Sequence, residues 1–149
     1  MIYSASRVIK ADPQKIWDLL SDLRHFAKND PFHSDFKFES EQREGVGAKF
    51  SVEHNYKPIF PFGSDRVMCT VSAWQPLGEV AINEKNPRHW WMDHSQRFVI
   101  EPVEDGVRVS YFISYIGVPW PFSIWVSRLV LKRMNEKLAE VEQDALTNL

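Results

Sequence analysis

The sequence has a single cysteine, Cys69, among its 149 residues. One cysteine excludes an internal disulfide and any zinc site built from several thiolates, and it fits a reducing compartment. We expect Cys69 to be a small buried side chain, as free cysteines usually are. A chain of this length buries about two-thirds of the surface that its unfolded form exposes, so one domain spanning residues 1–149 is expected.

The chain also lacks an excess of charge and any long apolar run. Lys plus Arg total 18 and Asp plus Glu total 20, for a formal net charge of -2. There is no basic field to hold phosphates, so nucleic acid is not an expected partner. No apolar run approaches the roughly 20 residues of a membrane span, and residues 1–14 lack the order of a signal peptide. We therefore expect a cytoplasmic protein, and nothing in the pattern calls for a cofactor.

What the sequence has in abundance is aromatic side chains: ten Phe, six Trp and four Tyr, or 13% of the chain. This is more than packing alone usually needs in a chain of this size. Large flat apolar surfaces are expected somewhere in the fold.

The spacing of apolar residues predicts a strand, two short helices, a run of strands and one long helix. The first strand covers residues 2–10, Asp12 and Pro13 open the first helix, and a second short helix follows Ser21 or Asp22. Pro121 opens a final helix of about 25 residues whose first half is apolar almost all round. Between the helices, turn signals separate strands at 34–43, 47–57, 65–75, 79–85, 90–102 and 107–116.

Short connections between consecutive strands imply an antiparallel meander. A sheet with one apolar face has to be covered, and the long helix is the element able to cover it. We therefore predict an α+β fold. A curved antiparallel sheet of about seven strands, with two short helices, holds the long C-terminal helix across its concave face over a cavity.

Five stretches of sequence carry a resemblance to a known family. They are ADPQKIWDLLSDLRHF, GVGAKF, VSAWQPLGEVAI, FVIEPVEDGVRVSY and LVLKRMNEKLAEVEQDAL. Together they resemble the START-like superfamily, also called SRPBCC or helix-grip, and in particular its polyketide cyclase/dehydrase-like branch. The resemblance implies a hydrophobic pocket between sheet and long helix, used in that superfamily for lipid, sterol, polyketide or quinone binding and occasionally for catalysis. Its motifs are structural turns and caps, so no catalytic residue carries over from them.

Strand alternation indicates which side chains face such a cavity. A two-residue turn at Asp105-Gly106 would set Ile100 opposite Tyr111 on the inward face. The same alternation turns His94 inward, while Asp93 and Arg97 point outward as an expected surface pair. The predicted ligand-binding residues are Phe50, Val52, His54, Tyr56, Glu84, Met92, His94, Gln96, Phe98, Tyr111, Ile113, Tyr115, Trp125 and Leu129.

Two inward histidines and a partly buried carboxylate, Glu84, raise the question of chemistry. Imidazole titrates near neutral pH, so such a group can transfer protons or hold a metal ion. We expect instead that these residues satisfy their neighbours or orient the polar end of an apolar ligand, and we expect no metal. His89 and His94 lie on opposite strand faces and cannot share one ion without a bulge. His54, His94 and Tyr111 stay as candidate catalytic residues.

In a meander, the connections at 57–64, 86–90 and 117–121 fall at the same end of the sheet. They gather the apolar residues that we predict as a cavity mouth: Ile59, Phe60, Phe62, Trp90, Trp120 and Phe122. Such a patch usually marks a place where something apolar docks. The alternative is a satellite core closed over the start of the helix. Transient contact with a membrane surface, or with a second subunit, is left open.

The leading hypothesis is a carrier or sensor, monomeric or homodimeric, for a hydrophobic or amphipathic small molecule such as a lipid, a polyketide or a quinone. A first alternative is a cyclase or dehydratase with His54 or His94 as base and Tyr111 or Tyr115 donating to an enolate oxygen. A second is an interaction module docking through its aromatic end. A histidine and a carboxylate within hydrogen-bond reach in a closed pocket would favour catalysis, whereas the absence of any co-purifying ligand together with a cavity below about 300 Å³ would argue against carriage.

Overall fold

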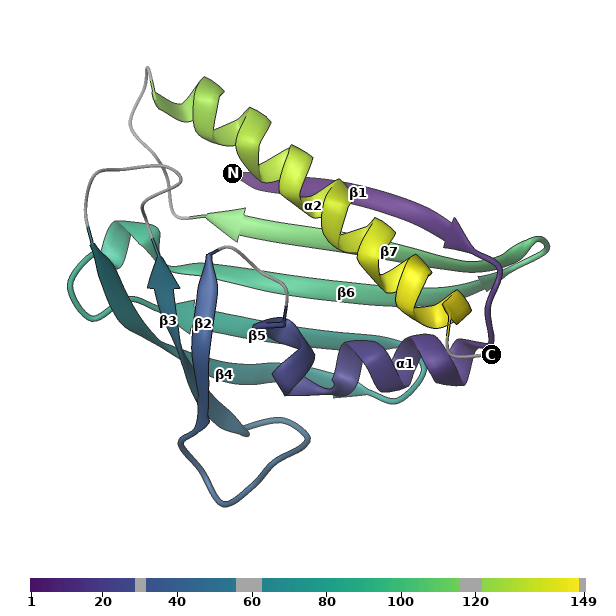
Figure 1. The fold of residues 1–149 in the computed structure, drawn as a ribbon, viewed down its shortest axis with the longest axis horizontal. Coiled ribbons are helices and arrows are strands. Elements are labelled where there is room, and N and C mark those ends of the chain that lie inside the picture. The colour runs from purple at the N-terminus through teal and green to yellow at the C-terminus, as the bar shows by residue number, and fades with distance from the viewer. Residues whose placement is uncertain (29–31, 56–62, 116–121, 148–149) are drawn as a thin grey trace.

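The computed structural model describes residues 1–28, 32–55, 63–115 and 122–147, without the side chain of residue 122 (Figure 1). The strands are β1 (Ile2–Ile9), β2 (His33–Phe38), β3 (Lys49–Asn55), β4 (Ser64–Gln75), β5 (Glu79–Lys85), β6 (His94–Val103) and β7 (Gly106–Tyr115). The helices are α1 (Pro13–Ser21) and α2 (Phe122–Thr147), with two single-turn 3-10 helices, η1 (Leu23–Phe26) and η2 (Trp90–Met92).

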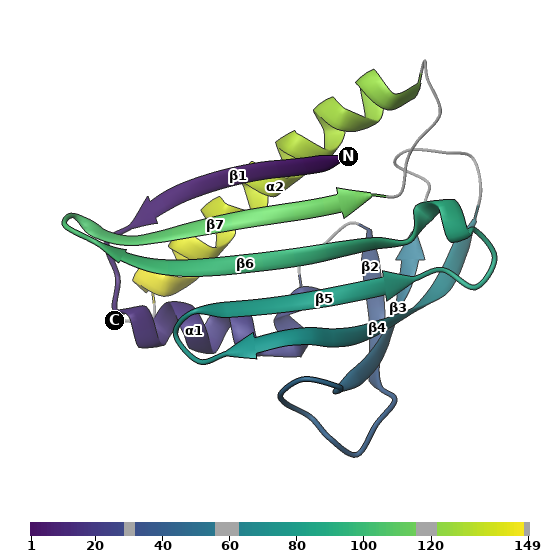
Figure 2. The same cartoon turned by 180° about the vertical axis from the view of Figure 1, so that it is seen from behind.

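The strands form one seven-stranded sheet in the order β1-β7-β6-β5-β4-β3-β2, and every neighbouring pair is antiparallel. Helix α2 crosses one face of this sheet diagonally, with α1 beside its C-terminal end (Figure 1). The opposite view shows the other face of the sheet with both helices behind it (Figure 2). The predicted α+β arrangement of a meander gripping a long helix is confirmed.

The sheet is strongly curved at one end. Strands β2 and β3 run steeply across the direction of β5–β7 in Figure 1, and β4 pairs with β3 along its first half and with β5 along the rest. A register shift between Val71 and Ala73 lies in the β4–β5 ladder, as expected where a bulge helps a strand to bend. The curvature brings side chains of β2 and β3 over those of β5 and β6.

Helix α1 begins and ends where its sequence dictates. The side chain of Asp12 accepts from the backbone N–H of Gln14 at 2.8 Å, and Pro13 takes the first helical position, where its missing N–H costs nothing. Asp22 ends α1 and caps η1 in the same way, through the N–H of Arg24 at 3.0 Å. These two caps confirm the predicted pair of short helices.

Two clusters of buried apolar residues hold the fold together. The first lies between α2, α1 and the central strands, and it includes Ile100, Met134 and Leu138. The second lies under β2 and includes Phe50 and Cys69. Each such side chain, fully buried, contributes about 1.5–3 kcal/mol relative to exposure. Cys69 is 0% exposed, and burial raises the pKa of its thiol, so it is the inert core residue that we expected.

The β6–β7 hairpin corrects one predicted register. Val103 lies opposite Gly106, so the turn residues are Glu104 and Asp105 rather than Asp105-Gly106. Each residue of β6 consequently meets a partner two positions from the predicted one, and Phe98 faces Tyr111. Because side chains alternate with period two, a slip of two leaves every inward residue inward. Gly106 is needed for another reason: a Cβ there would lie 2.6 Å from the carbonyl oxygen of Ile9 on β1.

Two predicted strand bounds also change. The strand predicted at 34–43 is β2 and ends at Phe38, and the strand predicted at 90–102 begins only at His94. The residues before His94 form the turn η2, which is closed by the N–H of Asp93 donating to the carbonyl of Trp90 at 3.1 Å.

Candidate functional site

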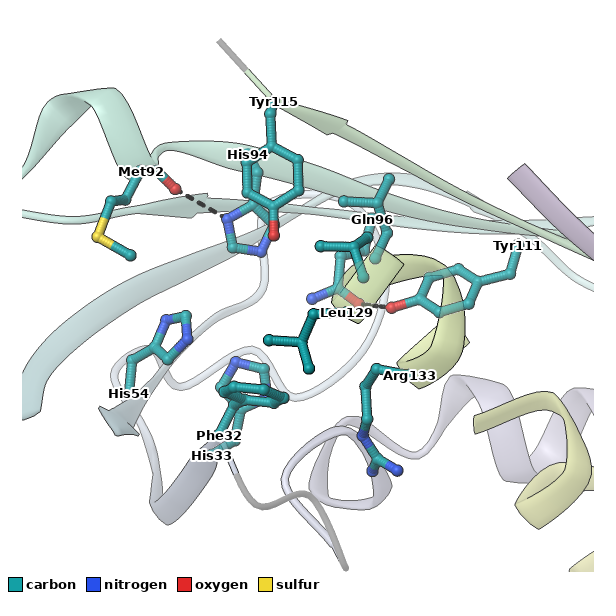
Figure 3. Close-up of a pocket in the computed structure, with 12 residues that line it drawn as sticks. Phe32, His33, His54, Met92, His94, Gln96, Tyr111, Tyr115, Leu129 and Arg133 are labelled. Atoms are coloured by element: carbon teal, nitrogen blue, oxygen red, sulfur yellow. Dashed lines mark hydrogen bonds between the residues drawn. The ribbon is translucent and has the colours of Figure 1, made fainter. Parts of the chain in front are cut away.

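A pocket lies between the inner face of the sheet and the N-terminal half of α2 (Figure 3). Strands β2, β3, β6 and β7 supply most of its wall, and Leu129, Val130 and Arg133 of α2 close the opposite side. Its lining residues are Phe32, His33, His54, Met92, His94, Gln96, Tyr111, Ile113, Tyr115, Leu129, Val130 and Arg133.

The pocket is small. It offers about 80 Å³, and a second pocket of about 40 Å³ adjoins it across the shared residues Gln96, Tyr111, Ile113 and Arg133. Pockets that enclose drug-sized ligands measure roughly 300–1,000 Å³. The described walls therefore suit a compact ligand, or the polar end of a larger one.

The structure brings together most of the residues predicted to face the cavity. Phe98 lines the second pocket, beside Tyr111 and Ile113. The predicted residues that line the first pocket are His54, Met92, His94, Gln96, Tyr111, Ile113, Tyr115 and Leu129. Strand alternation places seven of these correctly, and Leu129 follows from the apolar stripe of α2.

Other predicted lining residues lie elsewhere. Phe50 and Val52 are fully buried, but they belong to the second core cluster and line neither pocket. Trp125 is 48% exposed and its neighbour Ile124 is 57% exposed. The described residues therefore do not enclose the apolar start of α2 on every side. Tyr56 lies outside the described residues.

Of the residues predicted to form the cavity mouth, only Trp90 has a described side chain. Trp90 in η2 is 69% exposed, as a rim residue would be. The other mouth residues lie outside the described side chains: Ile59, Phe60, Phe62, Trp120 and Phe122. The expected surface pair of Asp93 and Arg97 is wrong. Arg97 instead donates to Glu79 at 2.6 Å, and Asp93 accepts from the backbone N–H of Asn86 at 2.8 Å.

Glu84 lies directly behind the polar part of the wall and is only 2% exposed. Its Oε1 accepts from Nε2 of Gln96 and lies 3.0 Å from Nε2 of His94. Its Oε2 lies 3.5 Å from Nε2 of His33. An ionised carboxylate without partners would cost several kcal/mol at this depth, so these contacts are what allow it to be there.

The hydrogen bonds of His94 determine its protonation. Its Nδ1 lies 2.9 Å from the carbonyl oxygen of Met92, which can only accept, so Nδ1 carries a proton. Its Nε2 faces the Glu84 carboxylate, so a second proton is shared between the two groups. Burial by itself favours neutral forms, but the Glu84 charge outweighs it and raises the pKa of His94. In turn, the imidazoles of His94 and His33 outweigh burial and hold the pKa of Glu84 well below its usual range.

A chain of hydrogen bonds extends this pair into the pocket. The hydroxyl of Tyr111 donates to Oε1 of Gln96 (Figure 3). The Nε2 of Gln96 in turn donates to Glu84. The amide of Gln96 is thereby held in one orientation. The ring of Tyr115 stacks on His94 with centroids 5.0 Å apart, and burial raises the pKa of Tyr115, so its hydroxyl stays protonated.

Sequence reasoning missed His33, which is 8% exposed and lies opposite His54 on the neighbouring strand. The strand was predicted to begin at residue 34, so His33 lay outside it, whereas β2 begins at His33. The β2–β3 register also shifts between Ser34 and Lys37, where Asp35 has a φ of 46°, so alternation read back from Phe36 and Phe38 would not have found His33. Phe32, Val130 and Arg133 were also missed, and of these Arg133 follows Leu129 by four positions, so helical spacing was a signal that could have found it.

The arrangement has an apolar part and a polar part. Leu129 and Val130 of α2 supply apolar surface, as does Ile113 of β7, whereas the imidazoles of His33, His54 and His94, the amide of Gln96 and the hydroxyl of Tyr111 come from the strands of the sheet. Figure 3 shows the labelled polar side chains arranged around Leu129. Such a surface can bind and orient an amphipathic molecule and can exchange protons with it. His33, His54 and Glu84 also each offer a metal-ligating atom within 4.8 Å of the others.

A curved meander that grips a long C-terminal helix, with a pocket enclosed between them, is the helix-grip architecture of START-like proteins. Sequence comparison agrees with this class. The chain belongs to the family described as polyketide cyclase/dehydrase and lipid transport, whose family model matches residues 2–149. No match is found among the curated proteins.

Solved structures support the same fold. Protein MLL2253 from Mesorhizobium loti is 14% identical, with a TM-score of 0.70 over 97% of this chain and 96% of that one. TTHA0849 from Thermus thermophilus is 18% identical, with a TM-score of 0.66 over 99% of both chains. The Aha1 dimer from Colwellia psychrerythraea is 19% identical, with a TM-score of 0.64 over 99% of this chain and 97% of that one. Among the described residues, no helix is long and apolar enough to cross a membrane.

Proposed function

We propose that the protein binds a small amphipathic molecule in the pocket under the N-terminal half of α2, as a carrier or sensor. The observation that supports this best is the hydrogen-bonded group of His94, Gln96 and Tyr111 in a pocket that is also lined by apolar side chains such as Met92, Ile113 and Leu129. These side chains are held before any ligand arrives, so little order is lost when a ligand binds. The family's description, which includes lipid transport, supports the same reading.

The site favours a particular kind of ligand. Its polar side offers donors and acceptors that match a carbonyl, hydroxyl or carboxyl group, and its apolar wall matches a ring or a short alkyl segment. A pocket of about 80 Å³ suits a compact ring system such as a polyketide or quinone fragment, or the polar end of a lipid. A whole acyl chain would need room beyond the described walls.

A pocket-filling variant tests this proposal. Leu129 lines the pocket, so Leu129→Trp should occupy it, whereas Leu131→Trp places the same bulk on a side chain of α2 that is 38% exposed. Both variants are purified beside the wild type, and each is examined by native mass spectrometry and by organic extraction for a co-purifying compound.

We expect a compound on the wild type and on Leu131→Trp but not on Leu129→Trp. Circular dichroism checks that the filled variant is folded. If all three proteins carry no compound and none binds sodium octanoate, octanol or 1,4-naphthoquinone by calorimetry, the proposal is wrong. It is equally wrong if Leu129→Trp retains the compound.

A second candidate function is acid–base catalysis on the bound molecule, as a cyclase or dehydratase. It is favoured by the 3.0 Å contact between His94 and Glu84 in a buried site. Because Glu84 holds a proton on His94, His94 is suited to act as an acid, and His54 is left as the base. The hydroxyl of Tyr111 or Tyr115 would then stabilise an enolate oxygen.

Hydrogen–deuterium exchange separates catalysis from binding. The co-purified compound is incubated with the protein in deuterium oxide, and mass spectrometry follows deuterium entry at carbon positions next to a carbonyl. Catalysis predicts exchange with the wild type, loss of exchange in His54→Gln and retained binding in that variant. Exchange no faster than without protein leaves binding as the function and rules out this chemistry for that compound.

A further inference from the structure

We propose that His33, His54 and Glu84 bind one divalent transition-metal ion, leaving coordination positions open toward the pocket. The proposal goes beyond organic ligand binding and does not depend on it. Two imidazoles and one carboxylate, together with open positions, make the ligand set of many zinc and non-haem iron sites.

The ligand atoms are already close to coordination distances. One atom from each of the three residues lies within 4.8 Å of the other two. Zinc bonds to histidine and carboxylate measure about 2.0–2.2 Å, which sets neighbouring ligand atoms about 3.3 Å apart around a tetrahedral ion. The Oε2 of Glu84 and the Nε2 of His33 are 3.5 Å apart, so that edge fits as it stands. The widest edge has to close by at most about 1.5 Å when the ion binds.

The two histidines are held by regular structure. His33 and His54 face each other directly across β2 and β3, with ring centroids 4.9 Å apart. Phe26 stacks on the His33 ring at 4.8 Å, and Phe32 packs edge-on against His54 at 6.2 Å. Metal ligands carried by strands and locked by packing hold their positions better than ligands on loops.

The two carboxylate oxygens of Glu84 have different neighbours. Its Oε1 is occupied by Gln96 and His94, while Oε2 is directed toward His33, at a separation longer than a normal hydrogen bond. In metal sites the ligating carboxylate is typically held by hydrogen bonds of this kind to its other oxygen. His94 fits that supporting role, because its own Nδ1 is anchored on the Met92 carbonyl at 2.9 Å.

The burial of Glu84 is a second argument for a cation. A carboxylate that is 2% exposed is favourable only beside positive charge, and a divalent ion supplies it more strongly than an imidazole does. The absence of thiolates from the ligand set argues against a copper(I) site, and the two imidazoles argue against magnesium or calcium, which prefer oxygen. Zinc is therefore the probe of choice.

The test uses protein without a histidine tag, stripped with a chelator and dialysed, and Zn²⁺ alone as ligand. Isothermal titration should show one ion per chain with a dissociation constant of about 1 µM or tighter. His33→Ala and His54→Ala should each weaken binding at least about 100-fold, and Gln96→Leu, which removes a supporting hydrogen bond, about 10-fold. His89→Ala is the matched control, because its side chain is 40% exposed and lies outside the three-residue set.

A readout on the wild type keeps the test valid if a variant fails to fold. The ring-nitrogen NMR signals of His33 and His54 should shift on addition of Zn²⁺, while those of His25 and His89 should not. Cobalt(II) substitution should give the visible absorption bands of a site with four or five ligands. Absence of binding at 0.1 mM Zn²⁺, or binding that moves neither His33 nor His54, would overturn the proposal.

Discussion

The two ends of the inner face of the sheet are made by the same strands but have opposite character. At the end beneath the C-terminal half of α2, β6 and β7 present Ile100 and Val109 to Met134 and Leu138, and all four are at most 4% exposed. At the other end, the same two strands present His94, Gln96, Tyr111 and Tyr115 to the pocket. Alternation and pairing are identical along the strands, so only the side chains differ.

The comparison shows where stability and function are separated in this fold. Apolar side chains packed without voids stabilise the folded state directly. Buried polar groups contribute little net stability even when they are fully hydrogen-bonded, and they are costly when a partner is lost. The proposed binding role accounts for a polar end that is satisfied by the chain of contacts from Tyr111 through Gln96 to Glu84.

The largest expected effect is in the apolar end. Met134 is 0% exposed, so Met134→Ala should lower the free energy of unfolding by about 4 kcal/mol, through lost transfer energy and the cavity left behind. Leu129→Ala enlarges a pocket that already exists and should cost about 1 kcal/mol. Urea unfolding measures both. Equal losses would mean that the two ends are packed alike, against the comparison.

Next in size is the loss of the buried charge. Glu84→Ala should lower the free energy of unfolding by about 3 kcal/mol, because His94 and Gln96 lose their partner in a buried site. The double variant Glu84→Ala/His94→Ala should cost about 2 kcal/mol less than the sum of the single variants. Unfolding is followed at pH 7 with a chelator present. Additive losses would show that the two residues do not act as a pair.

Two buried tyrosines give a matched comparison of a hydroxyl that lines the pocket with one that lies beside it. Tyr111→Phe leaves the Gln96 amide without its donor and should lower stability by about 1.5 kcal/mol, as should Tyr3→Phe, whose hydroxyl contacts Ser127 at 2.7 Å outside the pocket. Only Tyr111→Phe should also weaken binding of the co-purified compound, by about 10-fold. Calorimetric titration measures that difference, and equal binding by both variants would separate Tyr111 from the site.

The smallest effect lies at the C-terminal end of α2. The His25 ring, 2.9 Å from Asp144, and the nearby Lys28 lower the pKa of Asp144. A carboxyl whose pKa is lowered by folding stabilises the protein above its unfolded value, and that contribution is lost as pH falls through the folded value. Asp144→Asn should therefore cost about 1 kcal/mol at pH 7.

The difference between wild type and Asp144→Asn should shrink as pH falls below about 4. Thermal unfolding across this range measures it. A difference that stayed constant down to pH 2 would show that packing of the side chain, and not its charge, is responsible.

Some features of the fold and site could be predicted from the alternation of side chains along a strand, here called parity. Others needed the exact position of a residue in the structure. Parity survives error: the β6–β7 register was wrong by two residues, yet Gln96, Phe98 and Ile113 face inward as predicted. Position does not survive: the strand predicted to begin at residue 34 begins at His33, and a bulge follows it, so His33 was missed. The cap at Asp12 depends on local chemistry and was predicted correctly, whereas the turn of the β6–β7 hairpin was predicted one residue too late.

Properties that depend on three-dimensional packing were beyond sequence reasoning. The depth of Glu84 depends on the curvature that brings β2 and β3 over β5, and it was predicted only as partly buried. The volume left between α2 and the sheet depends on how closely the helix packs, and the sequence predicts a cavity there without its size. The exposure of Trp125 shows that an apolar helix start need not be enclosed by the rest of the described chain.

The central claim is that the polar end of the inner face binds a small amphipathic molecule and the apolar end does not. Methyl NMR of the wild type during titration with the co-purified compound, or with octanoate in its place, tests this most directly. The methyl signals of Met92, Ile113 and Leu129 should shift and saturate together, while those of Met134 and Leu138 stay in place. Shifts confined to exposed residues such as Leu131, or no shift at any concentration, would contradict it.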